Sequence, residues 1–370
     1  MANEPSHFEP ALISGGKSPL RLAFSYVLDW IIIIIVAGVG GYLYKITGYN
    51  HAFSLDDPSI SYPLVANTVS ITIVGIVACA VPAVVIFILC LLIPSSTIQI
   101  SSQGEGDTRS LWHRRLWEWH AGWLGLGFSL AGAFLVTSGL KDVVGKPRPD
   151  FLARCDPDLS NIAAYVVSGL GLNKTSAPIL VNTGICRNMD ISVVKDGFAA
   201  FPSGHSSFSW AGLLYLSLWL SAKFALTFPG PFRLSPSRRQ GDGNVNMVSP
   251  FRSLAAAPPL YLLLLVLAPV AVALFICATR YADYMHAGWD IIGGSLIGIA
   301  FAWAGFRWYH VSPRGAESCG YAGWAWAPRP TWGAFGVPFG SPGFGRNEDS
   351  MREVRTTTSG YEDLELGPIQ

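Results

Sequence analysis

The sequence contains few charged residues. Only 13% of its 370 residues are Asp, Glu, Lys or Arg, and 51% are hydrophobic, whereas a soluble domain carries about 25% charged residues. This deficit excludes an ordinary soluble globular protein. The net charge of +1 excludes a strongly basic nucleic-acid binder, so we expect no nucleic acid among its partners. Six cysteines in so long a chain are too few for a disulfide scaffold.

The few charges leave long uncharged windows, which cover residues 58–104, 119–140, 197–222 and 253–279. Each window is long enough to cross a bilayer, which takes about 20 helical residues. Segment 22–44, in which Asp29 is the single charge, and segment 291–306 add two more. We therefore predict an all-α integral membrane protein with six transmembrane helices.

The distribution of Lys and Arg predicts the orientation of these helices, because short loops rich in both stay in the cytosol. Basic clusters precede the first helix, separate the second from the third, and separate the fourth from the fifth: Lys17 and Arg21; Arg109, Arg114 and Arg115; Lys223, Arg233, Arg238, Arg239 and Arg252. The loop at 141–196 falls on the other side although it is itself basic, but long loops follow the rule poorly. We expect residues 1–20 to be a cytosolic segment, 21–310 a six-helix domain, and 311–370 a cytosolic, largely disordered tail.

Two features of the long loop agree with a place outside the cytosol. Asn173, followed by Lys174 and Thr175, matches the N-glycosylation acceptor pattern. Cys155 and Cys186 are the only cysteines in this loop, and two thiols in one flexible loop tend to pair in an oxidising compartment. We predict a Cys155–Cys186 disulfide; the alternative is two free thiols in a surface loop.

Three polar clusters interrupt helix ends, and six-helix parity puts all three on the non-cytoplasmic face. In the first, Lys141 and Arg148 are two fixed cations that suit an anion, although such residues often only anchor a helix end. In the second, Ser203 is a candidate N-cap and Gly204 lets the backbone approach a ligand, so free N–H groups could hold phosphate beside His205. The alternative is an ordinary capped helix start with an interfacial His.

The third cluster, at 279–290, contains Arg280, His286 and Asp290. His286 and Asp290 are four residues apart, so on one helix they share a face. The carboxylate could then accept a hydrogen bond from one imidazole nitrogen and leave the other nitrogen unprotonated. Arg280 offers a planar fork for phosphate oxygens.

Taken together, the clusters resemble the three signature motifs of the type-2 phosphatidic acid phosphatase superfamily, K-x6-RP, PSGH and SR-x5-H-x3-D. The matching residues are Lys141, Arg148 and Pro149; Pro202, Ser203, Gly204 and His205; Arg280, His286 and Asp290. The one departure is Thr279, where the family pattern has Ser. Within the superfamily, residues 53–63 and the long third loop make the chain look most like fungal lipid phosphatases of the diacylglycerol pyrophosphate phosphatase type.

The resemblance implies a metal-independent phosphoryl transfer in two steps, with a phospholipid in the bilayer as substrate. His286, oriented by Asp290, attacks phosphorus and forms a phosphohistidine. His205 protonates the leaving oxygen and can then activate water. The non-bridging oxygens are held by the remaining motif residues, Lys141, Arg148, Ser203, Gly204 and Arg280.

A metal site is the alternative for any cluster of His and Asp. The two histidines and Asp290 could form a two-His, one-carboxylate zinc site. The three cations of the clusters would repel a metal ion, however, and can themselves replace it as a clamp for phosphate charge. We therefore expect no metal cofactor.

These observations favour hydrolysis of lipid phosphates such as diacylglycerol pyrophosphate, phosphatidate and lysophosphatidate, in an endomembrane such as the vacuole with a lumenal active site. A phosphotransferase of the same fold, with an alcohol as acceptor, is a second possibility. A transporter or receptor that only binds anionic lipid is a third, but it would not need all of His205, His286 and Asp290.

Overall fold

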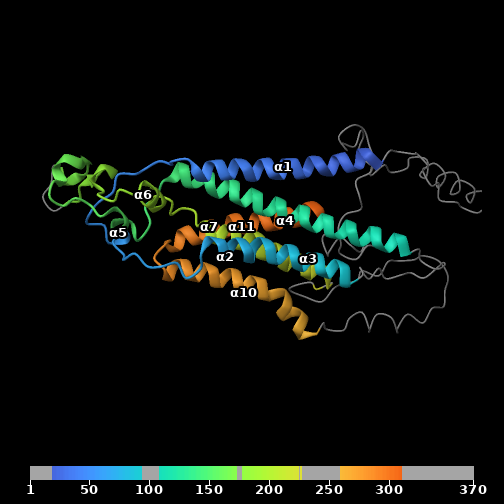
Figure 1. Ribbon diagram of the computed structural model, residues 1–370. Coiled ribbons are helices and arrows are strands. Elements are labelled where there is room, and N and C mark those ends of the chain that lie inside the picture. Colours follow the sequence, from blue (N-terminus) through green and yellow to red (C-terminus); the bar gives the residue numbers. More distant parts are fainter. Residues whose placement is uncertain (1–18, 94–107, 173–176, 225, 227–258, 311–370) are drawn as a thin grey trace, which may run out of the picture. The chain divides into compact units, whose positions relative to one another are not determined.

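The computed structural model describes residues 19–93, 108–172, 177–224, 226 and 259–310 (Figure 1). The chain divides into two units, Trp30–Ala327 and a second formed by Met1–Asp29 with Pro328–Gln370. Of the second unit, only residues 19–29 at the start of helix α1 are described. The predicted cytosolic tail, 311–370, lies outside the described residues.

Long helices dominate the described part of the chain, and several are built from consecutive helical segments. Their bounds are α1 (Pro19–Lys45); α2 (Ile71–Gly75), the π-helical turn η2 (Ile76–Ala80) and α3 (Val81–Leu92); α4 (Thr108–Val144); α7 (Gly204–Ser209), the π-helical turn η6 (Trp210–Leu214) and α8 (Tyr215–Lys223); α10 (Leu260–Ala282); and α11 (Gly288–Tyr309).

Five helices within the described residues are long and apolar enough to cross a membrane. They are Phe24–Lys45, Ile71–Leu92, Arg115–Val144, Leu260–Ala282 and Gly288–Tyr309. They fall in five of the six predicted windows, so the all-α membrane architecture is confirmed. The window 197–222 is not among them: its helical part begins only at Gly204, and five serines between Gly204 and Lys223 make it less apolar.

Helix α11 packs against α4, α7 and η6, and small residues allow the close contact with α7. A methyl group on Gly294 would overlap the carbonyl oxygen of Ser203, and one on Gly298 would overlap the carbonyl oxygen of Ser207. The backbones of α7 and α11 are therefore in direct contact.

The two π-helical turns also pack against each other. A methyl group on Gly212 of η6 would overlap the carbonyl oxygen of Ala78 in η2 and would lie 2.7 Å from its carbonyl carbon. Both residues are buried. Wide turns of this kind are found mostly as single bulges, frequently near functional sites, and here η6 directly continues the helix that carries the PSGH sequence.

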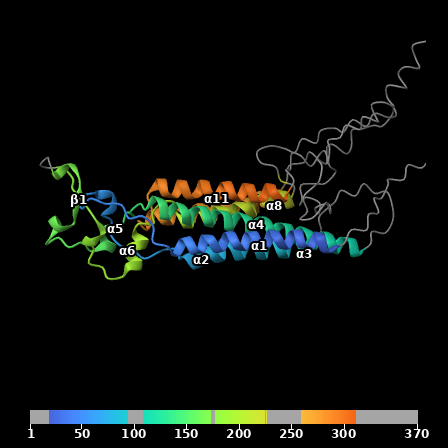
Figure 2. The same cartoon turned by 90° about the horizontal axis from the view of Figure 1, so that it is seen from above.

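The segments 46–70 and 145–203 gather at one end of the helices and form a small domain that we call the cap (Figures 1 and 2). Its regular elements are η1 (Pro58–Ile60), α5 (Phe151–Cys155), η3 (Ile162–Tyr165), β1 (Val166–Ser168), η4 (Leu170–Leu172), β2 (Leu180–Val181), η5 (Thr183–Ile185) and α6 (Ile191–Gly197). The strands are antiparallel, with Val166 opposite Val181. A separate apolar core, built around Phe53, Phe151 and Phe198, holds the cap together.

Candidate active site

All three polar clusters lie at the end of the helices that the cap covers. Lys141 is in the last turn of α4, Ser203 precedes α7, and His286 lies between α10 and α11. The backbone N–H of Ser203 donates to the carbonyl of Asp290 (2.9 Å). A Cβ atom on Gly204 would lie 3.7 Å from Nζ of Lys141. Segments that are far apart in sequence therefore form one site.

His286 is the buried centre of this site, with only 2% of its surface exposed. Its Nδ1 lies 2.7 Å from the carbonyl oxygen of Ala200. A carbonyl can only accept, so Nδ1 carries the proton and Nε2 keeps its lone pair. Burial first, and then the positive charges of Arg148 and Lys141, hold the pKa of His286 well below its ordinary value of 6.5. The imidazole is therefore held in its neutral form, with Nε2 unprotonated.

The predicted hydrogen bond between His286 and Asp290 is not the one that the structure contains. Helix α11 begins at Gly288, so His286 precedes it and the four-residue spacing does not place the two side chains on one helical face. Asp290 instead accepts from the N–H of Ala287 (2.9 Å) and from Nζ of Lys146 (2.7 Å). Its side chain is fully buried, whereas that of Lys146 is 40% exposed.

Lys146 is thus a site residue that the sequence analysis missed, although it lies between Lys141 and Arg148 in the same cluster. It fixes the carboxylate that caps the start of α11. The carbonyl of Ala200, rather than a carboxylate, orients the imidazole of His286.

Arg148 is almost entirely buried and is held by an acidic residue of the cap. Its Nη2 donates to Oδ1 of Asp196 (2.7 Å), and its Nη1 lies 3.4 Å from Sδ of Met285. Its Nε has no hydrogen-bond partner among the described residues. Burial opposes ionisation of Asp196, but Arg148, Lys141 and Arg154 lower its pKa below the usual value, so the pair stays ionised.

Arg280 is fully buried at the end of α10. Its Nη1 donates to Oδ1 of Asn67 (2.9 Å) and its Nη2 to Oδ2 of Asp283 (2.8 Å). The hydroxyl of Thr279 accepts from Nε (3.3 Å). The Thr that departs from the family pattern therefore keeps a hydroxyl contact with the arginine.

The PSGH sequence begins α7 as predicted, and Ser203 is confirmed as the N-cap. Its Oγ accepts from the N–H of Ser206 (3.4 Å). Nε2 of His205 lies 3.2 Å from the carbonyl of Val69, in the segment that precedes α2. The extended chain before α2 thus closes the His205 side of the site.

A cavity of about 310 Å³ opens beside Lys141, between the ends of α1 and α4 and helix α6. Its lining is mixed, with lysines, carboxylates and aromatic rings: Tyr44, Lys45, Gly48, Tyr49, Asn50, Ser138, Lys141, Asp142, Ser192, Lys195, Asp196, Phe198 and Ala199. Since Lys141 and Asp196 belong to its wall, the cavity adjoins the first of the three clusters.

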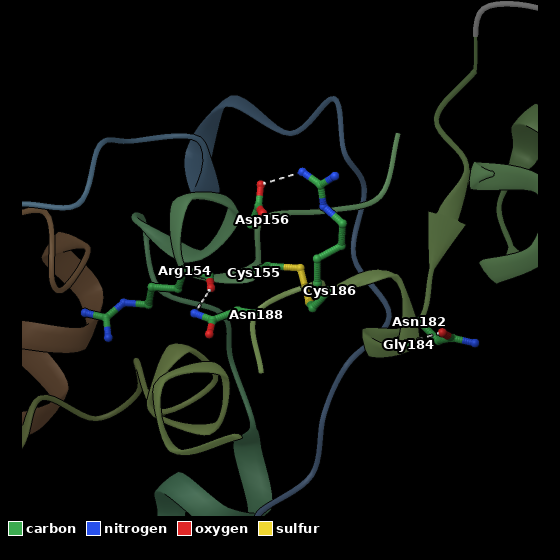
Figure 3. The surroundings of a disulfide bond; sticks show 8 residues. Arg154, Cys155, Asp156, Asn182, Gly184, Cys186 and Asn188 are labelled. Atoms are coloured by element: carbon green, nitrogen blue, oxygen red, sulfur yellow. Dashed lines mark hydrogen bonds and ion pairs between the residues drawn. A yellow bond between two sulfur atoms is a disulfide. The ribbon is translucent and has the colours of Figure 1, made fainter. Parts of the chain in front are cut away.

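A disulfide joins Cys155 to Cys186 in the cap, with the two Cα atoms 4.6 Å apart (Figure 3). It ties the last residue of α5 to the residue that directly follows η5. The predicted glycosylation site, Asn173, lies outside the described residues.

The sequence profile of the PAP2 superfamily matches residues 122–314, which is more than half of the chain. The chain belongs to the PAP2 superfamily. The resemblance noted from the three motifs is thereby confirmed, and the matched region contains all of them. No solved structure matches the chain significantly.

Plant and fungal proteins are among the relatives of this PAP2 protein. "Lipid phosphate phosphatase 2" of Arabidopsis thaliana is 30% identical over 285 residues, which cover 76% of this chain and 77% of that protein. "Probable diacylglycerol pyrophosphate phosphatase 1" of Schizosaccharomyces pombe is 29% identical, with 70% of this chain and 72% of that protein covered. "Diacylglycerol pyrophosphate phosphatase 1" of Saccharomyces cerevisiae is 26% identical, with coverages of 77% and 80%.

Proposed function

We propose that this PAP2 protein hydrolyses lipid phosphates and lipid pyrophosphates, among them phosphatidate, lysophosphatidate and diacylglycerol pyrophosphate. The observation that carries the proposal is a buried, neutral His286 whose Nδ1 is bonded to the carbonyl of Ala200 and which feels the positive charges of Arg148 and Lys141. The names of its relatives support the choice of a lipid as substrate.

In the first step, Nε2 of His286 attacks phosphorus and the bond from phosphorus to the leaving oxygen breaks. His205 donates a proton to that oxygen, so a neutral alcohol, or a lipid phosphate in the case of a pyrophosphate, departs. In the second step, water attacks the phosphohistidine, His205 takes the proton of the water, and the P–N bond breaks to release phosphate. Each step needs one acid or base, and His205 serves both.

The charge that develops on the non-bridging oxygens needs fixed positive partners. We assign this role to Lys141, Arg148 and Arg280, with Ser203 and the backbone of Gly204 as further donors. The guanidinium of Arg148 is already oriented by Asp196, so little reorganisation accompanies the reaction. Asp290 acts indirectly, by capping α11 beside His286.

We also propose that the chain crosses the membrane six times, with Gly204–Lys223 as one more crossing beside the five apolar helices. The site then lies on the lumenal side of an endomembrane such as the vacuole. A disulfide in the cap suits an oxidising compartment, and the short basic loops then lie in the cytosol. Glycosylation of Asn173 in cells, detected as a mass shift on endoglycosidase treatment and lost in Asn173→Gln, tests this orientation.

The decisive experiment measures inorganic phosphate released from the three lipids by purified, detergent-solubilised protein in the presence of chelator. We expect release from wild type and none from His286→Ala. Transfer of the phosphoryl group to an added alcohol without free phosphate would identify a transferase instead. Lipid binding without any turnover would identify a transporter or receptor.

A further inference from the structure

We propose that Arg154 and Asp196, which lie outside the three motifs, are positioning residues that keep Arg148 available to bind a phosphoryl group. The inference rests on the proposed function, because it assigns phosphate binding to Arg148. Neither residue needs to contact the substrate for this role.

The first observation is a chain of alternating charges that runs from α5 to the site. Oδ1 of Asp196 accepts from Arg148 (2.7 Å) and its Oδ2 accepts from Arg154 (3.0 Å). Arg154 in turn donates from Nε to Oδ1 of Asp150 (2.8 Å), and its Nη2 forms an ion pair with Oδ2 of the same carboxylate (2.8 Å). Asp150 and both arginine side chains are buried, with 9% or less exposed, while the side chain of Asp196 is 45% exposed.

This division of Asp196 between two arginines has an electrostatic consequence. A carboxylate prefers to bind one guanidinium with both oxygens. Because Arg154 occupies Oδ2, Asp196 orients Arg148 through one oxygen only. The Nε of Arg148 is left without a hydrogen-bond partner among the described residues. Without Arg154, Asp196 can bind Arg148 with both oxygens and compete with a phosphoryl group.

A second observation connects the same residues to the nucleophile. Nη1 of Arg148 and Nη2 of Arg154 both lie against Sδ of Met285, at 3.4 and 3.1 Å. Met285 is buried and directly precedes His286. A displacement of either guanidinium would therefore shift Met285 and, with it, the backbone that carries the attacking imidazole.

The backbone around Arg154 is itself firmly held. Its carbonyl accepts from Nδ2 of Asn188 (2.8 Å), and the next residue, Cys155, is bonded to Cys186 (Figure 3). On the other side, the N–H of Arg148 donates to the carbonyl of Gly197 (2.7 Å), next to Asp196. The cap thus supplies a rigid frame for Arg148.

The same loop offers a matched control. Arg187 pairs with Asp156 at 3.1 Å, but their side chains are 61% and 63% exposed. Arg187→Gln removes an ion pair of the cap without touching the chain of charges, so we expect no effect on anion binding, as for most exposed pairs.

The test measures the affinity of detergent-solubilised protein for orthovanadate, from the rise in thermal midpoint of each variant over its own unliganded value. We expect Arg154→Gln and Asp196→Asn to weaken vanadate binding about tenfold or more, and Arg187→Gln to leave it unchanged. Misplaced binding groups can cost about 100-fold in rate, so kcat/KM should fall in parallel.

A double-mutant comparison separates positioning from a merely structural role. In an Arg148→Gln background, Arg154→Gln should produce no further loss of vanadate affinity, because both act through one guanidinium. Losses that add, or wild-type affinity in both single variants, would overturn the inference. If Arg154→Gln does not fold, the same comparison can be made with Asp196→Asn, because the side chain of Asp196 is half-exposed. Wild type that binds vanadate but releases no phosphate from lipids would refute the proposed function alone.

Discussion

Substitution of Gly212 by Ala should lower stability substantially, because the added methyl group has no space. It would overlap the carbonyl oxygen of Ala78 and lie 2.7 Å from the carbonyl carbon, whereas carbon atoms in contact are best separated by about 3.5–4.0 Å. The obstacle is backbone, so the two π-helical turns must move apart by about 1 Å. Overpacking of a buried contact costs about 1–3 kcal/mol, and the rigid obstacle puts this substitution at the upper end.

Gly75→Ala is the matched control, since Gly75 immediately precedes the other π-helical turn and a methyl group there would meet no atom within 4 Å. Alanine in a helix is favoured over glycine by about 0.5–1 kcal/mol, so this variant should be slightly stabilised. Thermal midpoints of the two purified variants, at one scan rate, provide the measurement. We expect Gly212→Ala to lie below wild type by roughly 10 °C and Gly75→Ala to lie level with it or above. Equal midpoints for the two variants would refute the close contact between η2 and η6.

The variant His286→Ala should fold but release no phosphate. The variant His205→Ala should lose more activity on phosphatidate than on diacylglycerol pyrophosphate, because the phosphate that leaves from the pyrophosphate needs less protonation. Equal losses on the two substrates would exclude His205 as the acid. Because the pKa of His286 is lowered, the imidazole stays unprotonated as the pH falls. The rate of phosphoenzyme formation should therefore not drop about fivefold between pH 6.5 and 5.5, as it would for an unperturbed histidine nucleophile. A loss of rate centred near pH 6.5 in this step would contradict the reasoning, since His205 acts there as a protonated acid. Alkylation without reductant, followed by peptide mass analysis, should recover Cys155 and Cys186 as one linked peptide pair; two separately alkylated peptides would refute the bridge. The variant Cys186→Ala should be less stable than wild type by about 4 kcal/mol, which is the chain-entropy value for a separation of 31 residues.

The three motifs could be found from the sequence because each is short and its spacing is local. Lys141, Ser203 and Arg280 all lie at helix ends, where the sequence itself marks the boundary. The lack of charge also predicted the five spans that the structure contains among its described residues. The serine-rich segment from Gly204 to Lys223 shows the limit of that signal, because its hydroxyls reduce the hydropathy of a helix that packs inside the protein.

The partners of the site residues could not be predicted, because they depend on contacts between distant segments. Asp290 pairs with Lys146, 144 positions away, and His286 with the backbone of Ala200, 86 positions away. The predicted pairing of Asp290 with His286 required one helix to carry both residues. The start of α11 at Gly288, two residues beyond His286, removes that assumption.

The direct backbone contact between α7 and α11 limits the ways in which a lipid can reach the site. Where not even a methyl group fits beside Gly294 and Gly298, an acyl chain has no passage, and parting the two helices would separate Ser203 from Asp290. A substrate must therefore arrive from another direction around the bundle. The seam between α7 and α11 thus holds Ser203, at the start of α7, beside Asp290 of α11 whichever substrate is bound.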